Sequence, residues 1–264
     1  MRVSAYAKVN LTLDVLGKRP DGYHALRSVV QPISLADELE IDVTDDGTIA
    51  SDTGYGEKDL IVRAARALRP AACPLGCRVR VTKRIPAGGG LGGGSADAAA
   101  TLLALNELWS LGLSPEALAE LGARVGSDVP ALVLGQHYRR PVLMEGRGEI
   151  VSLLPAETSR WLVLANPGVS SSTAEVYAHC TPSGGPGAAE GSRLPNTLQE
   201  PAVRLYPAIG KALEELRACG AAGVMMSGSG ATVFGFAPDG ASAEKIASEV
   251  AARGYLSWTV RTLA

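Results

Sequence analysis

The sequence predicts an α+β protein, in which a strand-rich first part precedes a part where helices and strands alternate. Three observations favour this class. The first 45 residues carry apolar side chains at alternating or continuous positions, which is typical of strands. Six glycines fill all but one of positions 88–94, between a strand-like segment and an alanine-rich helical segment. Beyond residue 160, helix and strand patterns alternate to residue 262.

The length of the chain bounds its domain organisation. Its 264 residues, of which 46% are hydrophobic, are enough for one large core or for two smaller ones. A change of pattern after the strands near residue 154 favours two domains. We therefore predict one domain over residues 1–153 and a second over residues 154–264.

The first expected elements are three strands. They cover residues 3–15, 28–33 and 39–43, with a turn signal at Asp21-Gly22. Residues 59–68 have apolar spacing close to 3.6 and an acidic start, which predicts a helix. A strand at 77–84 then leads into the glycine-rich segment, and a helix at 98–109 follows that segment.

Later elements follow the same signals. Ser114-Pro115-Glu116 marks another helix start, and helices continue to about residue 134. Residues 140–154 return to short strands. The remaining elements are expected strands at 161–165, 222–226, 232–236 and 257–262 and expected helices at 207–219 and 242–253. Residues 181–193 have low complexity, which predicts a mobile surface loop.

Charge and cysteine content argue against several classes of function. The formal net charge is −2 with acids and bases interspersed, so we expect neither a nucleic-acid nor a membrane partner. The four cysteines and three histidines show no metal-binding spacing, so we expect no protein-bound zinc. No leader or membrane-spanning segment is apparent, which predicts a cytoplasmic protein. No sequence feature fixes its oligomeric state, and we expect a monomer or a weak homodimer.

The glycine-rich segment is the strongest functional signal. Six glycines lose much backbone freedom on folding, so close approach to a ligand is the simplest reason for them. A flexible linker is one alternative, but a strand and a helix brace the segment at both ends. A dinucleotide fingerprint is a second, since Gly88, Gly90 and Gly93 match its spacing, although no second strand with a terminal acid follows. The third interpretation is a phosphate cradle ahead of a helix, as a kinase would need.

Three separated motifs resemble those of the GHMP small-molecule kinases, in that family's order. They are residues 7–11 (Ala-Lys-Val-Asn-Leu), residues 86–96 (Pro-Ala-Gly-Gly-Gly-Leu-Gly-Gly-Gly-Ser-Ala) and residues 228–231 (Gly-Ser-Gly-Ala). Taken alone, the last could be an ordinary tight hairpin. The resemblance implies a two-domain GHMP fold, with an N-terminal domain like ribosomal protein S5 and a C-terminal ferredoxin-like sandwich of helices and sheet.

Further segments resemble the branch of this family that acts on a cytidine-diphosphate-linked tetritol. These are residues 17–24, 126–130 and 166–169, of which the first contains Asp-Gly-Tyr-His. The resemblance implies transfer of a phosphoryl group from ATP, with Mg²⁺, to a hydroxyl of that small molecule in non-mevalonate isoprenoid synthesis. Another GHMP kinase acting on a small alcohol, and a nicotinamide oxidoreductase or non-catalytic binder, remain as alternatives.

The resemblance also implies roles for individual residues. Asp128 would be the general base and Lys8 its cationic neighbour, although a helix cap and a solvated strand residue are the ordinary alternatives. The cytidine end would meet the rings of Tyr23 and Tyr177 beside His24. ATP would contact Pro86, Ala87, Gly88, Gly89, Gly90, Leu91, Gly92, Gly93, Gly94, Ser95 and Ala96. Asn10 and Thr173 are further candidates for substrate contacts.

Three segments depart from the family pattern. Asp59 stands where asparagine is usual, near the adenine pocket implied by the resemblance. Residues 196–200 (Asn-Thr-Leu-Gln-Glu) replace a more acidic segment, and residues 136–141 are bulkier and more basic than expected. The sequence identifies no metal-binding carboxylate, so Mg²⁺ would be held mainly by phosphates and water.

Overall fold

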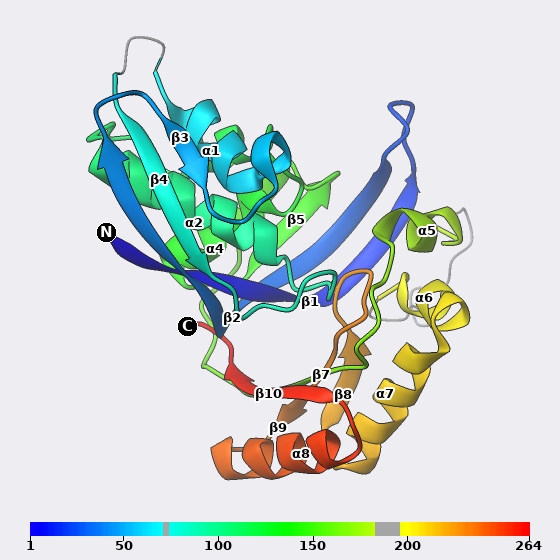
Figure 1. Cartoon of the computed structure of the whole chain (residues 1–264). Coiled ribbons are helices and arrows are strands. Elements are labelled where there is room, and N and C mark those ends of the chain that lie inside the picture. Colours follow the sequence, from blue (N-terminus) through cyan, green and yellow to red (C-terminus); the bar gives the residue numbers. More distant parts are fainter. Residues whose placement is uncertain (71–73, 183–195) are drawn as a thin grey trace.

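The computed structural model describes residues 1–70, 74–182 and 196–264. It contains two sheets with helices against them, in separate halves of the molecule (Figure 1). The first sheet is built from β1 (Arg2–Lys18), β2 (His24–Thr44), β3 (Ile49–Ser51), β4 (Gly76–Thr82), β5 (Val142–Gly146) and β6 (Ile150–Leu153). The second is built from β7 (Trp161–Asn166), β8 (Ala222–Met226), β9 (Val233–Ala237) and β10 (Leu256–Arg261). The α+β class is therefore confirmed.

The long strand β2 organises the first sheet. It pairs with β1 from His24 to Glu40, and with β5 and β4 at successive parts of its other edge. We predicted two separate strands at 28–33 and 39–43, and this was wrong. Three register shifts against β1 let one twisted strand run from His24 to Thr44, so the polar residues between the predicted strands cause no break.

Helices cover one face of this sheet. They are the short 3₁₀ turn η1 (Gly56–Lys58), α1 (Leu60–Leu68), α2 (Gly93–Leu108), α3 (Pro115–Gly122) and α4 (Val129–Tyr138). The helix α2 lies at the centre, buries alanines and leucines on nearly every side, and contacts α1, α3, α4 and β1. It begins at Gly93, five residues before the predicted start, so the last two glycines of the segment form its first turn.

The second sheet has the order β10-β7-β9-β8 and is antiparallel throughout. Its helices are α5 (Thr173–Ala178), α6 (Gln199–Leu205), α7 (Pro207–Ala218) and α8 (Gly240–Ala252). Residues of β7, β9 and β10 also join the core of the first half, and Leu13 and Val15 of β1 join the core of the second. The predicted division at 153/154 remains a prediction, because the two cores share strands.

Two sequence expectations concern membranes and loops. Across the three described segments, no helix is both long and apolar enough to cross a membrane. Most of the low-complexity stretch predicted to be a mobile loop, residues 183–193, lies outside the described residues.

Candidate active site

The glycine-rich segment connects β4 to α2, as the sequence predicted. Its residue Gly92 occupies the N-cap position of α2 with a left-handed φ of 70°, and no side chain caps the helix. The first N–H groups of α2 are therefore left available, and the helix dipole adds partial positive charge at this end. Such an uncapped N-terminus is suited to an anion such as phosphate.

A second glycine-rich loop, residues 227–231 between β8 and β9, packs directly on the first. The Ser227 hydroxyl donates to the Gly90 carbonyl at 3.0 Å, and the Thr232 amide donates to the Gly89 carbonyl at 3.1 Å. Gly90 has a φ of 73°, and a Cβ there would lie 2.2 Å from the Ser227 carbonyl oxygen. Only glycine allows the two backbones to approach this closely.

Lys8 on β1 lies beneath the first loop. Its amide donates to the Leu91 carbonyl at 3.0 Å, and its Cε is 3.1 Å from the position that a Cβ of Gly92 would take. The side chain is 4% exposed, so its charge needs partners. The Nζ donates to Asn10 Oδ1 at 2.6 Å and lies 3.6 Å from Asp128 Oδ2.

Asp128 stands at the N-cap position of α4, but its side chain makes no capping hydrogen bond. Capping, the structural alternative, therefore does not account for this carboxylate. Its side chain is 31% exposed, and Lys8 is its ion-pair partner. A Cβ on Gly228 would lie 3.3 Å from the Lys8 Nζ. The Lys8 ammonium therefore lies close to the second loop, to the first loop and to the partly exposed carboxylate of Asp128.

Asn10 supports this ammonium group from the same strand. It is 1% exposed, and its Nδ2 donates to the Ser28 hydroxyl at 2.8 Å while its backbone amide donates to the Ser227 hydroxyl. Both ends of its amide side chain are thus engaged within the protein. Its predicted role in substrate binding stays a prediction, and its observed contacts orient Lys8.

The predicted aromatic residues lie at the tip of the β1–β2 hairpin and on α5 (Figure 1). The rings of His24 and Tyr177 are 5.2 Å apart, whereas Tyr23 is 54% exposed and lies under the Arg147 guanidinium at 5.2 Å. Burial raises the pKa of Tyr177 far above its ordinary value, and the Asp128 charge adds to this rise. Tyr177 and His24 therefore lie together near Asp128, while Tyr23 remains separate from Tyr177.

Thr173, the remaining predicted contact residue, starts α5. Its hydroxyl lies 2.9 Å from the Ser229 hydroxyl of the second loop. Ser171 also donates to the Ser229 carbonyl at 2.7 Å, so the segment before α5 is fastened to this loop. Thr173 therefore lies beside the second glycine-rich loop, and its predicted contact with the substrate stays a prediction.

Asn196 is a site residue that the sequence reasoning missed. It is 1% exposed, its amide nitrogen donates to the carbonyls of Met226 and Gly228 at 2.9 and 2.8 Å, and it bridges to Leu13 on β1. It therefore holds the N-terminal end of the second loop against β1. The only sequence signal was its position at the start of a segment that departs from the family pattern.

Asp59 has a structural explanation. Its carboxylate caps α1 by accepting from the Ile61 amide at 2.9 Å, and it also accepts from the hydroxyls of Ser51 and Thr53. A carboxylate is a strong N-cap, because it accepts hydrogen bonds and complements the helix dipole. Asp59, which stands where asparagine was expected, thus stabilises the N-terminus of α1.

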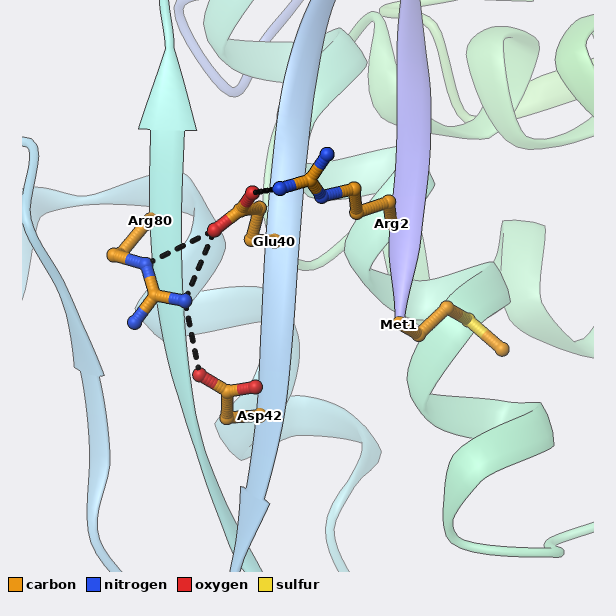
Figure 2. A pocket seen from close by; sticks show the side chains of 5 residues that line it. All are labelled: Met1, Arg2, Glu40, Asp42 and Arg80. Carbon is orange, nitrogen blue, oxygen red and sulfur yellow. Dashed lines mark hydrogen bonds and ion pairs between the residues drawn. The ribbon is translucent and has the colours of Figure 1, made fainter.

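Two further observations concern metal binding and a surface pocket away from this site. Within the described residues, no group of three His, Cys, Asp or Glu side chains could hold a metal ion. A surface pocket at the N-terminal end of β1 is lined by Met1, Arg2, Glu40, Asp42 and Arg80, whose charges pair with one another (Figure 2).

Comparisons with known proteins place this geometry in a family. Residues 59–136 match the model for the GHMP kinases N terminal domain, and residues 175–256 match the model for the GHMP kinases C terminal. The 4-diphosphocytidyl-2-C-methyl-D-erythritol kinase of Symbiobacterium thermophilum is 39% identical over 285 residues, covering all of both chains. That of Pelotomaculum thermopropionicum is 42% identical over 92% of this chain and 91% of its own.

Solved structures agree with these relatives. A crystal structure of 4-(cytidine 5'-diphospho)-2C-methyl-D-erythritol kinase superposes with a TM-score of 0.85 at 37% identity, covering all of both chains. A mevalonate kinase superposes with a TM-score of 0.71 at 14% identity, which shows the shared fold alone. The chain therefore belongs to the GHMP kinase family, and within it to the family of the 4-diphosphocytidyl-2-C-methyl-D-erythritol kinases.

Proposed function

We propose that this chain transfers the γ-phosphoryl group of ATP to a hydroxyl of 4-diphosphocytidyl-2-C-methyl-D-erythritol, the reaction for which its relatives are named, in the non-mevalonate route to isoprenoid precursors. One observation carries the proposal. The Lys8 ammonium lies against both glycine-rich loops and beside the Asp128 carboxylate, which makes no capping hydrogen bond. Phosphoryl transfer to an alcohol needs a phosphate cradle, a positive charge and a base at one point.

The phosphates of ATP would lie on residues 86–96. The uncapped N-terminus of α2 supplies backbone donors, and Gly88, Gly90 and Gly92 adopt positive φ angles that turn the loop without Cβ atoms. These donors are fixed before the ligand arrives, so little reorganisation is needed to bind negative charge. A triphosphate fits this cradle better than a dinucleotide, because no acid-terminated second strand follows α2.

Asp128 would take the proton of the attacking hydroxyl. As the new oxygen–phosphorus bond forms, the bond from the γ-phosphorus to the bridging oxygen breaks, and ADP leaves with that electron pair. The Lys8 ammonium beside Asp128 would offset negative charge on the transferring group. A positioned base of this kind contributes about 10²–10⁴-fold in rate.

The cytidine end of the substrate would bind at the hairpin tip. Tyr177 and His24 offer a ring surface, and Tyr23 would complete the aromatic pair on the opposite side. Stacking of a base on such rings contributes roughly 1–3 kcal/mol and needs no net protein charge. Thr173 and Asn10 would contact the diphosphate or tetritol hydroxyls between these rings and Asp128.

Mg²⁺ would reach the site with ATP. The described residues include no three-ligand group, so phosphate oxygens and water would supply most of its ligands, with the half-buried Ser95 hydroxyl at the start of α2 as a candidate protein ligand. When bound, the ion would neutralise charge on the phosphates. We further expect a cytoplasmic monomer or weak homodimer without a nucleic-acid partner, since the net charge is only −2.

A coupled assay of ADP release tests the proposal. With ATP, Mg²⁺ and 4-diphosphocytidyl-2-C-methyl-D-erythritol, we expect turnover and a product heavier by one phosphoryl group in mass spectrometry. Homoserine, mevalonate and galactose serve as competing alcohols, and thermal stabilisation by ATP is compared with that by NAD. Turnover of one of those alcohols in place of the cytidyl substrate, or protection by NAD alone, would overturn the proposal.

A further inference from the structure

An ionic cluster of two buried carboxylates and a lysine whose side chain is 43% exposed joins the two ends of the first glycine-rich loop. Lys83 follows β4, and its Nζ lies 2.5 Å from Asp37 Oδ2 on β2 and 2.8 Å from Asp97 Oδ2 on α2. The side chain of Asp37 is fully buried and that of Asp97 is 4% exposed. Carboxylates buried so deeply are costly unless paired, and the Lys83 ammonium pairs with both at once.

Asp37 fixes the entry to the loop. Its Oδ1 accepts hydrogen bonds from the backbone amides of Arg84 and Ile85, at 2.5 and 2.8 Å. These are the two residues before Pro86, where the predicted ATP-binding segment begins. One side chain therefore holds both the lysine and the backbone that leads into the loop, so the direction of entry depends on Asp37.

Asp97 lies at the exit from the loop, in the second turn of α2. The entry and exit also touch, because the Ile85 Cγ2 is 3.1 Å from the position of a Cβ on Gly93, and the Lys83 Nζ is 3.5 Å from it. The second oxygen of Asp97, Oδ1, is buried without a hydrogen-bond partner. Asp97 is thus held to the cluster through Lys83 and lies close enough to Asp37 for the two carboxyl groups to interact.

The cluster is poorly explained by stability alone. Buried ion pairs commonly contribute little net stability, because desolvation of both charges offsets their attraction. Burial indeed raises the pKa of the Asp97 carboxyl despite the neighbouring ammonium. What the cluster does provide is geometry, because it fixes the separation of the strand exit and the helix start that hold the loop between them.

We propose that Asp37, Lys83 and Asp97 form an ionic clamp that sets the conformation of the phosphate-binding loop, and that Asp37 is a positioning residue for the phosphoryl donor. The proposal rests on the proposed function only in taking ATP as the ligand of the loop. It assigns no contact between Asp37 and any substrate. Loss of the Asp37 charge would leave Lys83 paired with Asp97 alone, loosen the strand exit from the helix start, and shift the backbone N–H groups of the loop from the directions that phosphate needs.

Asp37→Asn tests the clamp, with Glu38→Gln as its matched control. The asparagine keeps an oxygen for the Arg84 and Ile85 amides but removes the charge that holds Lys83. Glu38 is the next residue on β2 and forms an exposed ion pair with Arg84 at 2.8 Å, so its variant also removes one carboxylate charge near the loop. We measure Kd for a non-hydrolysable ATP analogue with Mg²⁺ by calorimetry, and KM for both substrates.

We expect Asp37→Asn to weaken binding of the ATP analogue on the order of tenfold, with KM for the alcohol within about twofold of wild type. Glu38→Gln should bind the analogue as wild type does. A folded Asp37→Asn protein with unchanged Kd for the analogue would overturn the clamp, as would equal losses in both variants. If Asp37→Asn fails to fold, Asp97→Asn decides, since it leaves the Asp37 contacts intact and should weaken analogue binding by a smaller factor.

The same experiment separates failure of the clamp from failure of the proposed function. Wild-type protein that binds the analogue but does not turn over the cytidyl substrate would refute the proposed acceptor alcohol. The Kd comparison between Asp37→Asn and Glu38→Gln would still test the clamp in that case. Wild-type protein that turns over the substrate, with equal Kd in both variants, would refute the clamp alone.

Discussion

The two glycine-rich loops have similar composition but different surroundings. The first, residues 88–94, lies between a strand and a buried helix, and its ends are joined by the Asp37–Lys83–Asp97 cluster. The second, residues 227–231, is a hairpin connection held by the Asn196 side chain and by the Asn10 backbone amide, which donates to the Ser227 hydroxyl. The first loop thus leads into the free N–H groups at the start of α2, whereas the second loop packs against the first.

This difference shows that the positions of one glycine-rich motif are not occupied by glycine for a single structural reason. Gly90 has a positive φ and lies against the second loop, so both its angle and its missing Cβ are required. Gly94 lies in the first turn of α2 at an ordinary helical angle, and its Cβ would meet only Leu60 at 3.6 Å. The backbone angle and the space around each position, rather than membership of the motif, decide where glycine is required.

The largest effect should come from the carboxylate that faces both loops. Asp128→Asn keeps the size of the side chain and removes its basicity, so we expect kcat to fall by about 10²–10⁴-fold. Stability should change little, because the Asp128 side chain makes no capping bond. Asp239→Asn is the control, since it preserves the cap of α8 far from the loops. Steady-state kinetics that show equal kcat for the two variants would remove Asp128 from the mechanism.

A smaller effect, on stability, should separate the two glycines. Gly90→Ala places a side chain at positive φ and against the Ser227 carbonyl, which should lower the free energy of unfolding by roughly 2–4 kcal/mol. Gly94→Ala should leave the free energy of unfolding unchanged or raise it by up to about 1 kcal/mol, because alanine favours a helix. Urea unfolding of both variants measures this. Equal losses would mean that contact between the loops does not distinguish them.

The smallest effect concerns pH and the cluster beneath the first loop. Burial raises the pKa of Asp97 to about 7 from 3.8, so the folded protein keeps a proton there that the unfolded chain loses near pH 4. The folded state then binds more protons than the unfolded state between these values, and this group makes stability fall as pH rises. Asp97→Asn lacks the group.

We therefore expect the difference in free energy of unfolding, Asp97→Asn minus wild type, to rise between pH 5 and 7 by about 1 kcal/mol per pH unit. Urea unfolding at pH 5, 6 and 7 checks this, and titrations common to both proteins cancel in the difference. A difference that stays constant with pH would show that Asp97 is already ionised throughout this range.

Local elements and the chemical types at the site were predictable from sequence. The helix at 59–68, the strand feeding the first loop and the alternation beyond residue 160 follow from periodicity and turn residues, and the structure confirms them. The extent of β2 was not predictable, because cross-strand pairing with β1 overrides its polar interruption. Lys8 and Asp128 were recognised by motif, yet their 3.6 Å separation spans 120 positions in sequence.

Other site residues carried no pattern of their own. Asp37 is a single aspartate within a strand, and Asn196 stands beside a low-complexity stretch, so neither has a spacing that marks it. The ring neighbours of the predicted aromatic pair were likewise not readable from the sequence, since Tyr177 packs on His24 while Tyr23 lies under Arg147. Their role at the cytidine end stays a prediction.

The sequence by itself determined the α+β class, the braced glycine segment and its kinase family, because these depend on residue types and local periodicity. Only the tertiary structure decided at which positions glycine is required, such as Gly90. It also decided that Asp128 makes no capping hydrogen bond but lies beside an ammonium group, and that the buried carboxylate of Asp37 helps to join the ends of the loop. Those properties depend on distances between residues far apart in the chain, and packing of the two sheets sets these distances.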